Sequence, residues 1–259
     1  MLATDTYLGG ILIIAMSVLL ALAGLFLAHR LVPTPLRESH TAAAGLIYMP
    51  LSGLVGVVTA FTLFFVWQNF DAAYNTTQRE AGELADVYWH ADNLPDLDRQ
   101  EVQQLAQSYA QVVIDEEWPL MAQGRESTRA WEIVDEIRRR LDKVEPTTST
   151  EQVMYTREVT QFDAMVNDRR LRLLESREGL PPTLWASLLF ATPLLIIFTY
   201  IFGIKNFLMH VVLVATLTLV VTSILVTIRS IEYPFSGDLI VKPTSIEIVL
   251  DGFKANTEQ

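Results

Sequence analysis

Four stretches of the sequence contain no Lys, Arg, Asp or Glu, namely residues 6–29, 41–70, 179–204 and 206–228. Each is at least 23 residues long, and a helix of about 20 residues crosses the roughly 30 Å hydrocarbon core of a bilayer. Their length and apolar character predict four transmembrane helices. An integral membrane protein of this kind is not a soluble enzyme, a secreted domain or a nucleic-acid-binding protein.

The composition narrows the chemistry further. The chain has no cysteine, which excludes disulfides, thiolate metal sites and cysteine nucleophiles. The first apolar stretch does not look like a signal peptide, because no basic residue precedes it and it is too long for an h-region. The net charge of −11 argues against a broad basic surface for nucleic acid or anionic lipid.

The charged residues are concentrated between the second and third apolar stretches. Residues 71–178 hold 23 acidic and 13 basic residues, a net charge of −10, out of 49 charged residues in the chain. We therefore expect an all-α protein in four parts. These are transmembrane helices 1 and 2 (1–70), a helical cytoplasmic domain (71–182), transmembrane helices 3 and 4 (183–229) and a cytoplasmic C-terminal tail (230–259).

Local patterns predict the helices of the charged domain. Ser127 is an expected N-cap for a helix over residues 128–144, and a long helix is expected from about Ser149 to Arg177. The second apolar stretch has 30 residues, more than a bilayer needs, so its helix either continues into the charged domain or bends at Pro50. Residues 238–241 carry the one ambiguous strand signal.

The positions of Lys and Arg near the ends of the spans predict the orientation. The side with the charged domain and both termini carries seven such residues, against three on the side of the two short loops: Arg30, Arg37 and Lys205. Because cytoplasmic loops are enriched in Lys and Arg, the charged domain and both termini are expected in the cytoplasm.

The sequence offers no catalytic constellation. It has no phosphate-binding glycine loop, no nucleophile elbow and no histidine pair at metal-ligand spacing. The densest acidic group is Asp115-Glu116-Glu117, followed by Trp118 and Pro119. Adjacent carboxylates on a helix point in different directions, which favours a solvated helix end stopped by Pro119 over a metal site. We expect no catalytic residue and no cofactor, and a metal site stays open.

The second apolar stretch carries the most informative pattern. Met49, Gly53 and Val57 recur every four residues and so lie on one stripe of a helix. Ser52 and Gly56 form a pair of small residues typical of helix packing in membranes. The alternative is a helix that lines a pore, narrowed by apolar side chains that gate by dewetting. Spacing alone favours packing.

Two segments resemble the bestrophin anion channels. That family has an Ile-Pro-Leu-Ser motif, a glycine and then an aromatic and polar segment, and an Asn-Pro-Phe-Gly turn after its fourth span. The corresponding residues here are Met49-Pro50-Leu51-Ser52-Gly53-Leu54-Val55-Gly56, then Trp67-Gln68-Asn69-Phe70-Asp71, and Tyr233-Pro234-Phe235-Ser236-Gly237-Asp238.

More closely, nearly the whole chain resembles a bacterial family of bestrophin-like proteins that brings no established activity. The matching positions are His40, Trp67, Glu80-Ala81, Tyr109, Glu117-Trp118-Pro119 and Pro234-Phe235. The order of parts also agrees, with two spans, a helical insert, two spans and a Pro-Phe turn.

The resemblance implies a homo-oligomeric ion channel, most simply a pentamer in the bacterial inner membrane, in contact with lipid and small inorganic ions. The second span would line the pore. Its neck would contain Met49, Gly53 and Val57, with Pro50, Ser52 and Gly56 beside them. The C-terminal Pro-Phe motif would comprise Tyr233, Pro234, Phe235 and Asp238.

The sequence also departs from the bestrophin pattern. Three bulky apolar residues, two of them Phe, form the bestrophin neck, so Gly53 would make this neck wider. The acidic run of the calcium clasp is missing, since only Asp238 follows the motif, with Glu232 before it. The acidic insert supports cation selectivity as well as anion selectivity.

Two other functions are weighed against a channel. One is a non-conducting membrane protein that uses its acidic helical domain as a sensor or docking platform. The other, a membrane-embedded enzyme or proton-coupled carrier, is disfavoured because no charged residue lies within a span and only His210 is a histidine well inside one.

Overall fold

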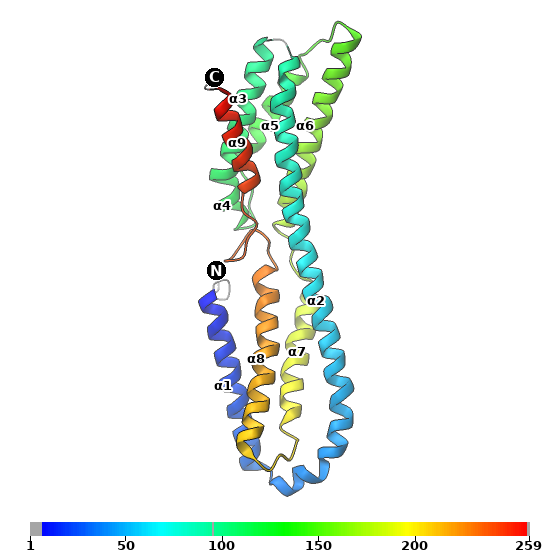
Figure 1. The fold of residues 1–259 in the computed structure, drawn as a ribbon, viewed down its shortest axis with the longest axis vertical. Helices are drawn as coiled ribbons and strands as arrows, with labels where there is room; N and C mark the ends of the chain where they lie inside the picture. The colour runs from blue at the N-terminus through cyan, green and yellow to red at the C-terminus, as the bar shows by residue number, and fades with distance from the viewer. Residues whose placement is uncertain (1–6, 95, 258–259) are drawn as a thin grey trace. The chain divides into compact units, whose positions relative to one another are not determined.

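A computed structural model describes residues 7–94 and 96–257 of the chain. Every regular element in these residues is a helix, which confirms the all-α prediction (Figure 1). The chain divides into two compact units. We call Met1–Gln68 with Gly179–Glu232 the apolar unit, and Asn69–Glu178 with Tyr233–Gln259 the polar unit.

The apolar unit contains α1 (Tyr7–Leu31), α7 (Pro182–Thr199), α8 (Phe207–Ile231) and the first part of α2 (Thr34–His90). Among the described residues, four helices are long and apolar enough to cross a membrane: α1, α2, α7 and α8. α1 and α8 lie side by side (Figure 1). Large parts of these helices are apolar and exposed, as expected of surfaces that meet lipid.

α2 is a single helix of 57 residues. The prediction that the second span continues beyond its apolar stretch is confirmed, and Pro50 does not end the helix. The proline lacks an N–H group, but a helix within a membrane tolerates this loss where neighbouring groups satisfy the freed backbone.

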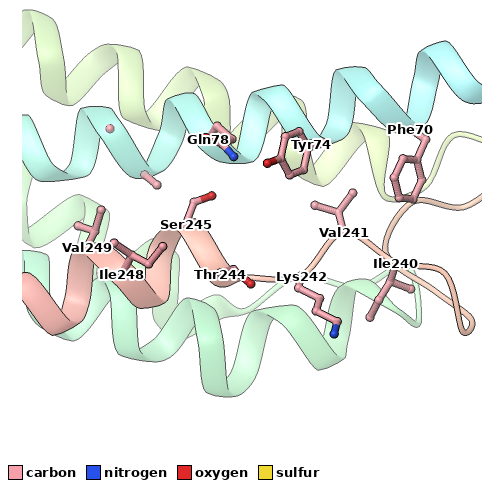
Figure 2. Close-up of a pocket in the computed structure, with 12 residues that line it drawn as sticks. Phe70, Tyr74, Gln78, Ile240, Val241, Lys242, Thr244, Ser245, Ile248 and Val249 are labelled. Carbon is pink, nitrogen blue, oxygen red and sulfur yellow. The ribbon is translucent and has the colours of Figure 1, made fainter.

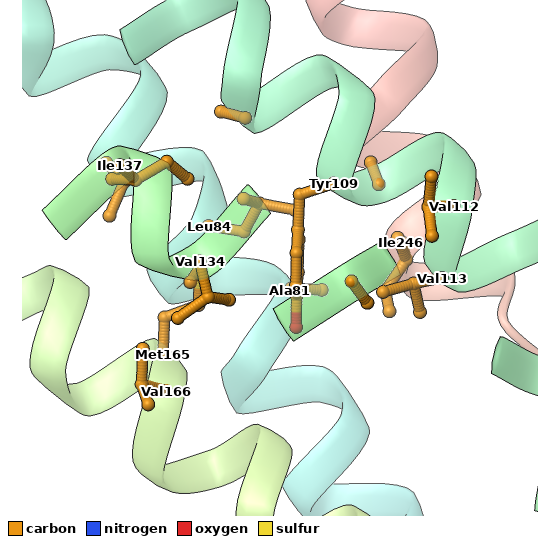
Figure 3. Packing of buried hydrophobic residues seen from close by; sticks show 14 of the residues in the cluster. Ala81, Leu84, Tyr109, Val112, Val113, Val134, Ile137, Met165, Val166 and Ile246 are labelled. Carbon is orange, nitrogen blue, oxygen red and sulfur yellow. The ribbon is translucent and has the colours of Figure 1, made fainter. Parts of the chain in front are cut away.

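The polar unit is built from the last part of α2 and several shorter helices. In chain order these are η2 (Ala91–Asn93), α3 (Asp96–Val112), the π-helical segment η3 (Val113–Glu117), α4 (Trp118–Met121), α5 (Thr128–Leu141), α6 (Ser149–Glu175) and α9 (Thr244–Thr257). Their apolar faces meet in one core (Figure 3). It joins Leu84 of α2, Tyr109 of α3, Ile137 of α5, Met165 of α6 and Ile246 of α9.

Two predicted helix starts are confirmed. The Ser127 hydroxyl accepts a hydrogen bond from the backbone N–H of Ala130 at 3.2 Å, and caps α5 as expected. α6 begins at Ser149, where Thr148 and Glu151 form a capping box. Both helices end two or three residues earlier than predicted. Residues 238–241 form no strand: they lie in an irregular segment before α9.

Candidate functional site

The six residues of the predicted neck lie within α2. Met49 and Val57 are 75% and 52% exposed, and Gly53 between them is also exposed. A Cβ atom placed on Gly53 or on Gly56 would meet no atom within 4 Å. Pro50 is exposed as well, and Ser52 is half-buried, with its hydroxyl donating to the Met49 carbonyl at 2.9 Å.

The other face of the same stretch of α2 is packed. Val55, Thr59 and Thr62 are at most 6% exposed. The Thr59 hydroxyl donates to the carbonyl of Val55 at 2.8 Å, which satisfies a polar group in an apolar setting. α2 therefore buries one side within its own chain and leaves the stripe of Met49, Gly53 and Val57 bare.

The Pro-Phe motif forms a turn within the polar unit. Phe235 is 1% exposed and contacts the Trp118 ring edge to face, with 5.5 Å between ring centroids. The backbone N–H of Val241 donates to the Pro234 carbonyl at 2.7 Å, and the Trp118 indole N–H donates to the Val241 carbonyl at 3.0 Å. These contacts tie the segment that leads into α9 to the core of the polar unit.

The acidic residues around the motif do not form a metal site. In the described part of the chain, no group of three or more His, Cys, Asp or Glu side chains could hold a metal ion. Asp238 is exposed, and Tyr233 before the turn is half-buried. The Glu232 carboxylate accepts hydrogen bonds from the Leu180 backbone N–H at 3.0 Å, the Trp185 indole at 2.9 Å and Arg229 at 2.7 Å, which link the start of α7 to the end of α8.

The polar unit buries four charged side chains in one network. Arg169 and Arg172 of α6 are both 0% exposed, and Glu117 and Glu80 are at most 1% exposed. Glu117 accepts two hydrogen bonds from Arg169, at 3.1 and 2.5 Å, and one from Arg172 at 2.9 Å. Glu80 of α2 accepts two from Arg172, at 2.5 and 2.9 Å. Two arginines and two carboxylates balance in charge.

Neutral groups also contact this network. The Tyr109 hydroxyl donates to Glu80 at 2.6 Å, and the backbone N–H of Ser127 donates to Glu117 at 3.3 Å. The Arg169 guanidinium stacks 4.1 Å from the centre of the Trp131 ring, a favourable cation–π contact. Burial raises the pKa of the Glu117 carboxyl, but Arg172 and Arg169 outweigh burial, so its pKa lies below the ordinary value and the group is ionised.

The expectation of a solvated helix end at residues 115–119 is wrong for Glu117. The helix does not stop at Pro119 but passes through the π-helical turn Val113–Glu117 and continues as α4. A π turn adds one residue to the helix and so rotates the residues that follow it. Glu117 then points into the core, whereas Glu116 remains near the surface and pairs with Arg129 at 2.8 Å.

A groove of about 620 Å³ lies between α2 and the segment that leads into α9, within the polar unit. Tyr74 and Gln78 of α2 face Val241 and Ser245 across it (Figure 2). Its lining contains Lys242 but no carboxylate.

Comparison with known families explains this architecture. The model of the bestrophin-like domain family matches residues 15–246, most of the chain. The chain belongs to the bestrophin-like family. The resemblance seen in its sequence motifs is thereby confirmed. A comparison with curated proteins finds no match.

Solved structures show that the bestrophin-like chain has the fold of bacterial bestrophin homologues. One neighbour is a leucine-to-threonine variant of a bacterial bestrophin homologue from Klebsiella pneumoniae, with a TM-score of 0.69 and 11% identity. Another is a proline-to-alanine variant of a membrane protein, with a TM-score of 0.67 and 11% identity. Each alignment covers 96% of this chain and 99% of the neighbour.

Sequence reasoning did not find the buried network of this bestrophin-like chain. Two signals were present. Glu80, Tyr109 and Glu117 are among the positions that match the bacterial family pattern. Arg169 and Arg172 stand three apart on the apolar face of the long helix, where a solvated arginine would be out of place.

Proposed function

We propose that the chain forms a homo-oligomeric ion channel whose pore is lined by α2. The observation that supports this most is the bare stripe of Met49, Gly53 and Val57 on a helix long enough to span a membrane. One helix cannot enclose a pore, so α2 from several copies must form a closed ring. Membership of the bestrophin-like family supports a channel, and the resemblance to bestrophins favours five copies.

The neck of this pore would gate by dewetting. A narrow apolar ring excludes ions because they must lose or confine their water to pass. Met49 and Val57 would supply apolar rings on either side of a wider ring at Gly53, with Pro50, Ser52 and Gly56 flanking them. Small inorganic ions would pass through the pore, and membrane lipid would contact the protein. The net charge of −10 over residues 71–178 favours cations near that domain, whereas the resemblance to the bestrophin anion channels favours anions. The reversal potential of the current distinguishes the two.

The ring is tested by the subunit count of the purified protein. Single-particle images in detergent or nanodiscs are expected to show closed rings of five copies with the α2 stripes facing the axis. A protein that remains monomeric at all concentrations, or rings with the stripe facing lipid, would exclude a pore lined by α2.

We further propose an inner-membrane location with the polar unit in the cytoplasm, as the Lys and Arg distribution favours. Because the chain has no native cysteine, single cysteines report position cleanly. Ser127 is buried and unsuitable for labelling, whereas Gln123 and Lys254 are exposed. Cysteines at Gln123 or Lys254 should resist a membrane-impermeant thiol reagent in intact cells and react after lysis. Labelling of either cysteine in intact cells would show that the polar unit lies outside the cytoplasm.

A further inference from the structure

Two carboxyl groups lie at the interface of α2 and α6 in the polar unit, and each has at least one buried oxygen without a hydrogen-bond partner among the described residues. Glu158 of α6 is 1% exposed, and in the described part of the chain neither of its carboxyl oxygens has a hydrogen-bond partner. Glu83 of α2 is half-buried, and its Oε2 atom is buried and likewise unpartnered among described residues. An ionised carboxylate is strongly disfavoured in such a place, so the group takes up a proton instead.

The arginine one turn before Glu83 on α2 is already paired with another carboxylate. Arg79 lies on the same helix but donates two hydrogen bonds to Asp168 of α6, at 2.8 and 3.3 Å. Glu80 is paired with Arg172, which donates two hydrogen bonds to it. Asp168, Glu80 and Asp86 all act on Glu83 as further negative charges, which favours its neutral form.

The surroundings of Glu158 are also acidic. Asp86 of α2 is the charged group that acts on it most directly. η2 packs against α6 and carries Asp92, which is exposed and accepts a hydrogen bond from Gln103 at 3.0 Å. His90 ends α2 beside η2 and is the one histidine in the sequence of the polar unit.

These surroundings place the titration of both groups near neutral pH. Burial, with a contribution from Asp86, raises the pKa of Glu158 to about 8. Burial and then Asp168 raise the pKa of Glu83 to about 7, against the opposing effect of Arg79. Glu175, further along α6, also has a raised pKa because of burial, although Thr76 donates a hydrogen bond to it at 3.1 Å.

We propose that the α2–α6 interface is a proton-operated switch, in which Glu83 and Glu158 hold protons while the helices are packed and α6 loosens when these protons are lost. The folded unit binds more protons than the unfolded chain, because both groups have raised pKa values. The stabilising contribution is therefore complete at acidic pH and disappears as the pH rises through about 7 and 8. The proposal concerns the polar unit alone and holds whether or not the protein conducts ions.

The test is an infrared pH titration of the purified full-length protein in detergent. Between about pH 6 and about pH 9, the wild type is expected to lose carbonyl intensity from buried protonated carboxyl groups. Glu158→Gln and Glu83→Gln, which mimic the protonated groups in shape, should each remove one component of that change. Glu145→Gln, at an exposed position, is the matched control and should leave the spectrum as in the wild type.

Hydrogen exchange then measures the loosening. After correction for intrinsic rates, amide exchange in residues 150–165 is expected to rise about tenfold over the same pH range in the wild type, and not in Glu158→Gln. The proposal is wrong if the wild-type spectrum shows no titrating protonated carboxyl. It is equally wrong if the carboxyl band titrates but exchange in α6 stays constant. The wild-type titration needs no variant, so the absence of a titrating carboxyl band contradicts the proposal even if a substituted protein does not fold.

Discussion

Replacing Gly53 by phenylalanine is expected to reduce the ion current roughly tenfold, because it adds an aromatic ring at the widest point of the proposed neck. The structure has room for it: a Cβ at Gly53 meets no atom within 4 Å, so the fold of the single chain need not change. The measurement is the current of the purified variant in planar bilayers. Leu54→Phe is the matched control, since Leu54 is 64% exposed but lies about 100° around the helix.

The opposite change is expected from polar substitutions on the same stripe. Met49→Ser or Val57→Ser would remove apolar surface from the constriction and so raise leak or open probability. If none of the three substitutions altered conductance or selectivity while the oligomer remained intact, the stripe would be a packing face between copies and the pore would lie elsewhere.

Glu117→Gln is expected to destabilise the polar unit by about 3–5 kcal/mol, because it leaves Arg169 and Arg172 buried with one carboxylate fewer. The change keeps the shape of the side chain and removes its charge. Chemical unfolding followed by tryptophan fluorescence would measure it, since Trp118 and Trp131 stack on Arg172 and Arg169.

The neighbouring residue provides the control for this prediction. Glu116 pairs with Arg129 at 2.8 Å, but both side chains are partly exposed. Such a surface pair contributes about 0–1 kcal/mol, so Glu116→Gln should change the free energy of unfolding by no more than that. Equal and small effects of the two substitutions would mean that the Glu117 network is not needed for the stability of the fold.

The elements that the sequence predicted well are those set by local chemistry. Uncharged runs mark the spans because a charge in hydrocarbon is expensive, and Ser127 marks a helix start because its hydroxyl replaces a missing backbone partner. The buried network could not be predicted in the same way. The network joins residues that are far apart in the sequence: Glu80, Glu117 and Arg172. The contact with Glu117 depends on a π turn that no local sequence pattern predicted.

The stripe on α2 shows the limit for the candidate site. Spacing put Met49, Gly53 and Val57 on one face but could not say which face of the helix is packed. Within one chain, the structure shows that the opposite face is the packed one, because Val55, Thr59 and Thr62 are buried there. What the bare face meets depends on other copies of the chain, and the family resemblance is what favours a pore there.

Conduction by the wild-type protein tests the central proposal most directly. Purified protein should be incorporated into planar bilayers with asymmetric salt on the two sides, and the reversal potential should be measured. We expect discrete currents that reverse away from zero, whose sign identifies the permeant ion as an anion or a cation. Intact rings of the bestrophin-like chain that pass no current under any salt gradient or voltage would contradict the channel and support a non-conducting sensor or docking protein.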